Sequence, residues 1–71
     1  MKNLVEQLRK EKGLTQEDFA KAIRVSRQTV SSIENGKYNP SLDLAYIIAD
    51  FFEKRIEDIF IYERGSINEE K

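Results

Sequence analysis

The side chains best suited to specific hydrogen bonding lie in a short polar segment that begins at Arg27. Arg27 and Gln28 are adjacent, and Ser31 and Ser32 follow within the same segment. A guanidinium can donate two hydrogen bonds to the edge of a guanine, and a carboxamide can both donate to and accept from an adenine. The segment therefore offers the chemistry needed to read base edges in the major groove of a DNA duplex.

Other kinds of chemistry are poorly represented. The 71 residues include no Cys and no His, so the sequence lacks disulfides, the usual general base and the commonest metal ligand. We therefore expect no enzyme activity, no metal site and no cofactor. No run approaches the ~20 apolar residues of a membrane-spanning helix, and no leader pattern is present. The expected protein is cytoplasmic, with no membrane association and no evident small-molecule ligand.

Charge is distributed unevenly along the chain. Residues 1–40 carry a net charge of +3, residues 41–71 carry −4, and the whole chain carries −1. A basic half beside an acidic half is compatible with a polyanion bound on one face.

The pattern of apolar residues and helix caps predicts an all-α protein with five helices. A first helix is expected to end near Gly13. Three later helices are expected to follow the caps Thr15, Ser26 and Ser41, and the helix after Ser26 should end at Asn35-Gly36. The helix after Ser41 is the most hydrophobic and should be central.

The C-terminal third is expected to add a last helical turn at 55–60. Residues 60–62 are aromatic and β-branched, which favours an extended segment, and residues 60–63 could pair with residues 1–3. We predict a single domain over residues 1–63 and a flexible tail over residues 64–71.

Two of these helices are short and separated by a very tight turn, which predicts a helix-turn-helix over residues 15–35. Ala20 is small enough for the first helix to cross the second closely, and Val25 is an apolar turn residue that can point inward. Val30 and Ile33 would anchor the second helix. Its opposite side, with Arg27 and Gln28, would then face outward.

These features together resemble the Cro/C1-type (Xre family) helix-turn-helix regulators, which have a lambda-repressor-like fold. The resemblance covers about residues 4–62 and is greatest to the short stand-alone repressors of that family. It rests on the joint spacing of Gln16, Ala20, Val25, Ser26, Val30, Ile33, Glu34-Asn35-Gly36 and Pro40-Ser41. It implies a sequence-specific regulator that binds double-stranded DNA.

The resemblance also implies a role for individual residues. Base-reading positions of the family correspond to Arg27, Gln28 and Ser32. Positions that contact phosphate or the edge of the groove correspond to Gln16, Ser26, Thr29, Asn35, Lys37 and Tyr38. Arg9 and Glu34 correspond to a further pair of family positions, which form an ion pair between the first helix and the third. We interpret this pair as structural.

The sequence departs from the family pattern at two turns. Arg24 occupies a turn position that is often Gly, where a left-handed backbone would cost roughly 1 kcal/mol. Between the fourth and fifth helices, Glu53, Lys54 and Arg55 replace the usual Gly, apolar residue and Ser cap.

The apolar load of the C-terminal third favours self-association. Ile56, Ile59, Phe60 and Ile61 follow a helix that is already well covered, so we expect an apolar patch that needs a partner. Similar short regulators form dimers through the loop before the fourth helix and through the fifth-helix segment, which implies an interface at Asn39, Pro40, Ile56 and Phe60. A two-fold homodimer would place the recognition helices roughly 34 Å apart and bind a near-palindromic operator, and we expect it to act as a repressor.

Two other functions fit parts of the sequence. The protein could be the DNA-binding antitoxin of a toxin–antitoxin pair, with the segment from about Arg64 onward holding the toxin; that segment is short, and Ile67 is its only apolar residue. It could also be a helix-turn-helix module for protein interaction without DNA binding. The basic N-terminal half argues against the second alternative.

Overall fold

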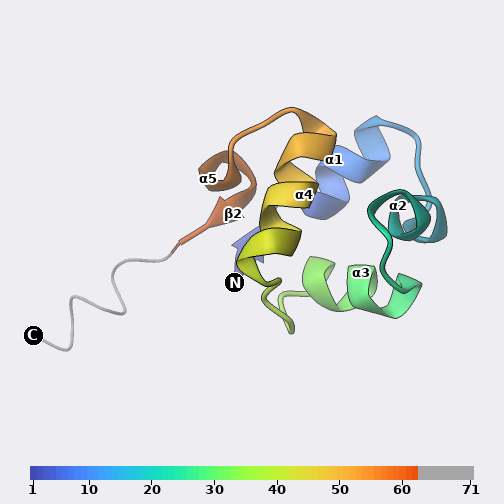
Figure 1. Ribbon diagram of the computed structural model, residues 1–71, viewed down its shortest axis with the longest axis horizontal. Helices are drawn as coiled ribbons and strands as arrows, with labels where there is room; N and C mark the ends of the chain where they lie inside the picture. Colours follow the sequence, from blue (N-terminus) through green and yellow to red (C-terminus); the bar gives the residue numbers. More distant parts are fainter. Residues whose placement is uncertain (63–71) are drawn as a thin grey trace, which may run out of the picture.

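The computed structural model describes residues 1–62 of the chain, and the predicted tail at 64–71 lies outside these residues. Within these residues, five helices and a pair of short strands pack around a common core (Figure 1). The elements are, in order, β1 (Lys2–Asn3), α1 (Val5–Glu11), α2 (Gln16–Ile23), α3 (Arg27–Glu34), α4 (Leu42–Phe52), α5 (Ile56–Ile59) and β2 (Phe60–Ile61). The predicted all-α fold with five helices and a short C-terminal strand is confirmed.

Three of the helices begin at the hydroxyl caps that the sequence predicts. Thr15 and Ser26 each accept a hydrogen bond at 3.0 Å from the backbone N–H three residues later, and Ser41 does so at 3.2 Å. Each bond satisfies one of the N–H groups that a helix start leaves without a partner within the helix. The bounds of α2, α3 and α4 therefore follow from local chemistry.

Two helices end at a non-glycine residue in the left-handed conformation. Arg24 ends α2 at φ 64° and ψ 46°, and Glu53 ends α4 at φ 57° and ψ 45°. The Cβ atom of an L-residue is crowded in this conformation. Both positions are the turns at which the family pattern would have provided a glycine.

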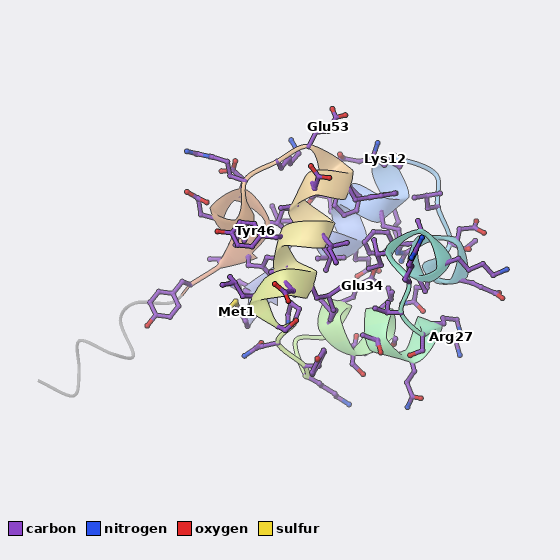
Figure 2. All side chains as sticks on the ribbon, in the orientation of Figure 1. Met1, Lys12, Arg27, Glu34, Tyr46 and Glu53 are labelled. Carbon is purple, nitrogen blue, oxygen red and sulfur yellow. The ribbon has the colours of Figure 1, made fainter. Side chains whose placement is uncertain are left out.

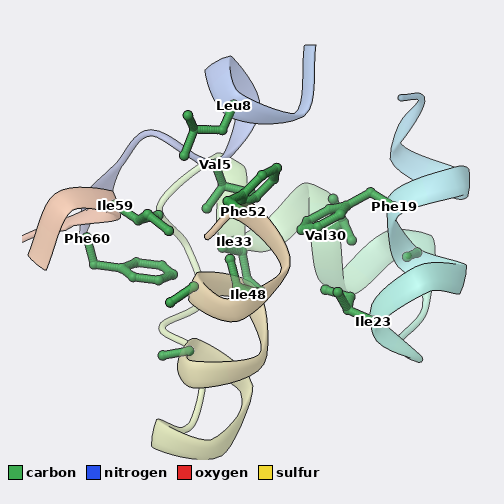
Figure 3. Close-up of a cluster of buried hydrophobic side chains, with 13 residues drawn as sticks. Val5, Leu8, Phe19, Ile23, Val30, Ile33, Ile48, Phe52, Ile59 and Phe60 are labelled. Carbon is green, nitrogen blue, oxygen red and sulfur yellow. The ribbon is translucent and has the colours of Figure 1, made fainter. Parts of the chain in front are cut away.

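The core lies where α2, α3 and α4 meet and extends to α1 and α5 (Figure 3). Ala20 is only 2% exposed, as a close crossing of α2 and α3 requires, and Val25 is half-buried against the core. The ring of Phe19 lies 5.3 Å from that of Phe51 and 5.2 Å from that of Phe52, centroid to centroid, distances typical of attractive aromatic pairs.

The two ends of the described chain meet in a small antiparallel sheet. Lys2 pairs with Ile61, and Asn3 pairs with Phe60. The N–H of Leu4 extends this pairing with a hydrogen bond of 2.9 Å to the carbonyl of Ile59. The predicted pairing of the N-terminus with the segment after the fifth helix is therefore present within these residues.

The expectation that the apolar residues from Ile56 to Ile61 form a surface excess is wrong for two of them. Ile59 is fully buried and Phe60 is 7% exposed, because the last helical turn packs against α4 and places both side chains in the core. The large apolar side chains that remain exposed are Met1, Tyr38, Leu42, Tyr46, Ile47, Ile61 and Tyr62.

Helix α5 begins without a side-chain cap. Its cap residue, Arg55, instead pairs through its guanidinium with the carboxylate of Asp58, at 3.2 Å between Nε and Oδ2. This hydrogen bond lowers the pKa of Asp58 below its ordinary value. None of the helices in residues 1–62 has the length and apolarity needed to cross a membrane.

Replacing Glu53 by Gly should stabilise the protein by about 1 kcal/mol, because glycine adopts the left-handed conformation without a steric penalty. The change also removes a carboxylate from the negative end of the α4 dipole. The measurement is the free energy of unfolding in urea.

Lys54→Gly is the matched control, since Lys54 is the next residue and is not among the positive-φ residues. It should give no stabilisation, because there is no left-handed strain to relieve. An equal gain in both variants would show that the backbone of Glu53 is not strained.

Candidate nucleic-acid interface

Helix α3 has one buried side and one polar, exposed side. Val30 is fully buried and Ile33 is 1% exposed, whereas Arg27 and Gln28 are exposed and Ser32 is half-buried. In Figure 2 the side chain of Arg27 extends away from the rest of the molecule at the start of α3. Within residues 1–62, the side chains of Arg27, Gln28 and Ser32 form no hydrogen bond with another residue.

A shallow hollow of about 260 Å³ lies along this side of α3, lined by Ser26, Gln28, Thr29, Ser32 and Tyr38. The hydroxyls of Ser26 and Thr29 are 2.9 Å apart and hydrogen-bonded to each other, and that of Ser26 also caps the helix. These two hydroxyls are therefore engaged in the start of α3. Within residues 1–62, the side-chain polar atoms of Gln28 and Ser32 have no hydrogen-bond partner and so remain available to another molecule.

The loop after α3 is folded back against the helix end. The N–H groups of Lys37 and Tyr38 both donate to the carbonyl of Ser32, at 3.0 and 3.2 Å. The intervening Gly36 has φ 77°, the left-handed conformation expected there. The side chains of Asn35, Lys37 and Tyr38 are exposed, so a cation and two further polar groups stand beyond the end of the helix.

Beneath this surface, the carboxylate of Glu34 joins three elements. Its Oε2 is 2.7 Å from Nε of Arg9, and its Oε1 is 3.2 Å from Nη2 of the same guanidinium. The side chains of Arg9 and Glu34 are only 8% and 3% exposed, and Glu34 lies in the interior of Figure 2. The structure therefore contains the ion pair expected from the resemblance, and the hydrogen bond to Glu34 raises the pKa of Arg9 above its ordinary value.

The side chain of Gln16 is not fully free to bind phosphate, because its amide already has a partner within the fold. Its Nε2 donates to Oε1 of Glu34 at 3.0 Å, so its half-buried side chain joins the Arg9–Glu34 group of polar residues. The guanidinium of Arg9 completes this group by donating to the carbonyl of Leu14 at 2.7 Å. Gln16 keeps one further N–H of its amide, and its backbone is at the first turn of α2.

Sequence reasoning assigned no role to Asn3, although its amide contacts two helices. Its Oδ1 accepts from the N–H of Val5 at 3.1 Å, and its Nδ2 donates to the carbonyl of Ile33 at 2.9 Å. An Asn just before a helix is a known local signal for the first contact. Nothing local could have revealed the second, because its partner is 30 residues away.

The structure brings together the four residues expected at a dimer interface. A mainly apolar groove of about 220 Å³ is lined by Met1, Asn39, Pro40, Leu42, Ala45, Ile56 and Phe60. We refer to these seven residues as the apolar groove. Phe60 requires a correction: it lines the groove, but with 7% exposure it belongs mainly to the core and offers little surface. Leu42 was not among the residues expected at the interface. It is 67% exposed and is the most exposed large apolar side chain of the groove.

In residues 1–62 there is no group of three or more acidic side chains that could hold a metal ion.

A family model described as helix-turn-helix matches residues 5–59, which is most of the chain and includes every helix. The chain belongs to the Cro/C1-type helix-turn-helix family of transcriptional regulators. Its members are DNA-binding proteins and not enzymes.

The similarity of this helix-turn-helix protein to its relatives covers nearly its whole length. It is 60% identical over 63 residues to an uncharacterized HTH-type transcriptional regulator of Methanocaldococcus jannaschii, covering 89% of this chain and 96% of the relative. It is 44% identical to an HTH-type regulator of Archaeoglobus fulgidus over all 71 residues of both chains. It is also 53% identical over 67 residues to the ImmF control region 10 kDa protein of Bacillus phage phi105, covering 87% of this chain and 74% of the phage protein.

The Glu34 contacts give a prediction for this helix-turn-helix protein. Glu34→Ala should lower the free energy of unfolding by about 3 kcal/mol, because it leaves the buried Arg9 cation without its partner. The amide of Gln16 loses its acceptor in the same variant. Urea unfolding monitored by circular dichroism measures the loss.

Glu6→Ala is the matched control, since Glu6 forms an ion pair of 2.9 Å with Lys10 in which both side chains are more than half exposed. Solvent screens this pair, so its removal should change stability little. Equal effects of the two substitutions would contradict a special role for the Glu34 carboxylate.

Proposed function

We propose that this protein is a homodimeric repressor that binds a specific double-stranded DNA sequence with α3 in the major groove. The observation that carries the proposal is the exposure of Arg27 and Gln28 on the side of α3 opposite the buried Val30 and Ile33. Side chains of these types can discriminate base pairs by paired hydrogen bonds. Ser32, further along α3, would make a third contact with base edges.

The groups proposed to bind the phosphate backbone stand at both ends of α3. Ser26 and Thr29 lie at its start, and Asn35, Lys37 and Tyr38 lie beyond its end. Gln16 is the first residue of α2, and its amide contacts Glu34 in the last turn of α3. Contacts on both sides of a base-reading helix fix its register along the duplex without reading sequence. For Gln16, the remaining amide N–H and the first turn of α2 are the groups available to a phosphate.

The apolar groove is the proposed surface of association between two copies. The residues Asn39, Pro40, Ile56 and Phe60 would meet the same residues of a second copy across a two-fold axis. Leu42 adds the most exposed apolar side chain of that surface. A dimer of this kind binds two half-sites roughly 34 Å apart, so the operator is expected to be nearly palindromic.

Repression follows if the operator overlaps a promoter, since a bound dimer then excludes the polymerase. It needs no surface beyond those that bind DNA and join the two copies. A regulator of this kind acts where the chromosome is, which places the protein in the cytoplasm. Selection of bound fragments from genomic DNA would yield the operator, and a failure to enrich any common sequence would contradict the proposal.

Gln28→Ala should weaken binding to the selected operator by about 1–3 kcal/mol and leave binding to random DNA nearly unchanged, because an amide that reads a base contributes only at the correct base. The measurement is the affinity for both DNAs at one fixed salt concentration. Equal losses on both would show that Gln28 does not read bases.

Lys37→Ala is the comparison that separates the two kinds of contact. A lysine that contacts a phosphate strengthens binding to DNA of any sequence and releases a counterion. Its loss should therefore weaken binding to the operator and to random DNA by the same factor. The slope of log affinity against log salt should fall by about one unit. An unchanged slope would remove Lys37 from the phosphate contacts.

Leu42→Asp should convert the dimer to a monomer, because it places a charge in the apolar groove. The variant should still fold, since Leu42 is 67% exposed in the single chain and an acid is favourable in the first turn of a helix. Sedimentation equilibrium over a range of protein concentrations measures the association constant.

Ile47→Asp is the matched control. Ile47 is on the same helix and is 48% exposed, but it lines a different hollow, with Leu44 and Val25. This variant should dimerise like the unmodified protein. Loss of dimerisation in Ile47→Asp alone would move the interface to the other side of α4.

A further inference from the structure

Asn3 lies where the terminal sheet meets the end of the recognition helix, beside the N-terminal amino group of Met1, which donates to the carbonyl of Gly36 at 3.3 Å. Asn3 pairs with Phe60 in the sheet, and its side chain reaches the carbonyl of Ile33 in the last turn of α3. In Figure 1 the N-terminal end of the chain lies between β2 and the loop after α3. Asn3 therefore contacts both β2 and the last turn of α3.

The oxygen and the nitrogen of the Asn3 side-chain amide bind different parts of the fold. Its oxygen accepts from the N–H of Val5 and so caps the start of α1, while its nitrogen donates to Ile33, at 2.9 Å, and to Met1, at 3.3 Å. The oxygen meets an N–H and the nitrogen meets carbonyls, so the orientation of the amide follows from its surroundings. A substitution that keeps the oxygen and replaces the nitrogen would keep the cap and lose the link to α3.

The carbonyl that Asn3 holds is close to the proposed DNA contacts. The carbonyl of Ile33 also accepts from the N–H of Gly36, and that of the preceding Ser32 accepts from the N–H groups of Lys37 and Tyr38. The position of this last turn of α3 thus sets the position of the loop. A shift of the turn would move the backbone from which Lys37 and Tyr38 extend.

On its other side, Asn3 adjoins the apolar groove. Its neighbour in the sheet, Phe60, and the nearby Met1 both line the groove. Asn39 and Pro40 line it as well, and they directly follow the loop that is hydrogen-bonded to Ser32. Part of the groove is therefore formed by the terminal segments and the loop, which the Asn3 link connects to the end of α3, and the rest is formed by α4 and α5.

We propose that Asn3 is a positioning residue that couples occupation of the apolar groove by a second copy to the placement of the end of α3 and its loop. When the groove is covered, the terminal sheet is held in place, and through Asn3 so is the last turn of α3. Association and operator binding are thereby linked inside each subunit. This inference rests on the proposed homodimer, and its first test needs no DNA.

The test compares Asn3→Asp with the unmodified protein by amide hydrogen exchange in the absence of DNA. The aspartate keeps an oxygen for the N–H of Val5 and places a second oxygen against the carbonyl of Ile33. We expect the N–H groups of Gly36, Lys37 and Tyr38 to exchange about three- to tenfold faster, the effect of losing one hydrogen bond. The amides of Val30 and Ile33 in the middle of the core should exchange as before.

Asn3→Ser is the second variant, in case the carboxylate of Asn3→Asp hinders folding. A serine can cap a helix start, but its side chain is too short to reach Ile33. Gln7→Ala is the matched control, because it removes an exposed amide that contacts only Glu11, within α1. Faster exchange of the loop amides in the control, or unchanged exchange in both Asn3 variants, would overturn the proposal.

The coupling itself is tested by varying protein concentration. In the unmodified protein, the exchange of the Gly36, Lys37 and Tyr38 amides should slow as the dimer forms. In the Asn3 variants it should not depend on concentration, even though sedimentation still shows dimers. A residue with only a structural role would change the exchange rates equally at all concentrations, and that result would overturn the coupling.

Operator affinity completes the test. If the unmodified protein binds an operator, Asn3→Asp should lose affinity most under conditions in which the protein is dimeric. If no DNA is bound at all, the proposed function fails, while the exchange measurements still decide the role of Asn3. The two hypotheses are therefore tested by different measurements.

Discussion

The arrangement of the helices depends on one buried carboxylate. Glu34 is on the recognition helix, and it holds Arg9 of α1 and Gln16 of α2 by charged or polar hydrogen bonds of 2.7 to 3.2 Å. A charge that is 3% exposed is costly unless all of its lone pairs are directed at donors, so the three side chains can adopt few other arrangements. The contacts therefore tie α3 to both α1 and α2 at one defined geometry.

Most of the local structure was predictable from short-range patterns. The hydroxyls at Thr15, Ser26 and Ser41 bind N–H groups three residues away, so the signal and its consequence lie in the same few residues. The buried side of α3 was equally predictable, because Val30 and Ile33 have the spacing of residues on one face of a helix. The Arg9–Glu34 pair is different, since its members are 25 residues apart and only the resemblance to a family could suggest their contact.

What the sequence could not reveal are the contacts that depend on the path of the whole chain. From the sequence, Phe60 looks like excess apolar surface, but the last helical turn packs against α4 and Phe60 is buried in the core. Gln16 reads as an exposed polar residue at a helix start, yet its amide is turned toward a carboxylate 18 residues away. For the candidate site, the sequence thus predicted which side chains face outward on α3, but not which polar groups are already engaged within the fold.

These contacts explain how so short a helix can present a defined surface. Helix α3 has eight residues, and an isolated helix of this length would be marginal in water. Its start is capped by Ser26, its middle is anchored by Val30 and Ile33, and its last turn is held by the carbonyl and carboxylate contacts of Ile33 and Glu34. Those last contacts come from β1, α1 and α2, so the end of the helix is placed by elements that lie outside the exposed face. A change in those elements can therefore alter what α3 presents without changing any side chain on its exposed face.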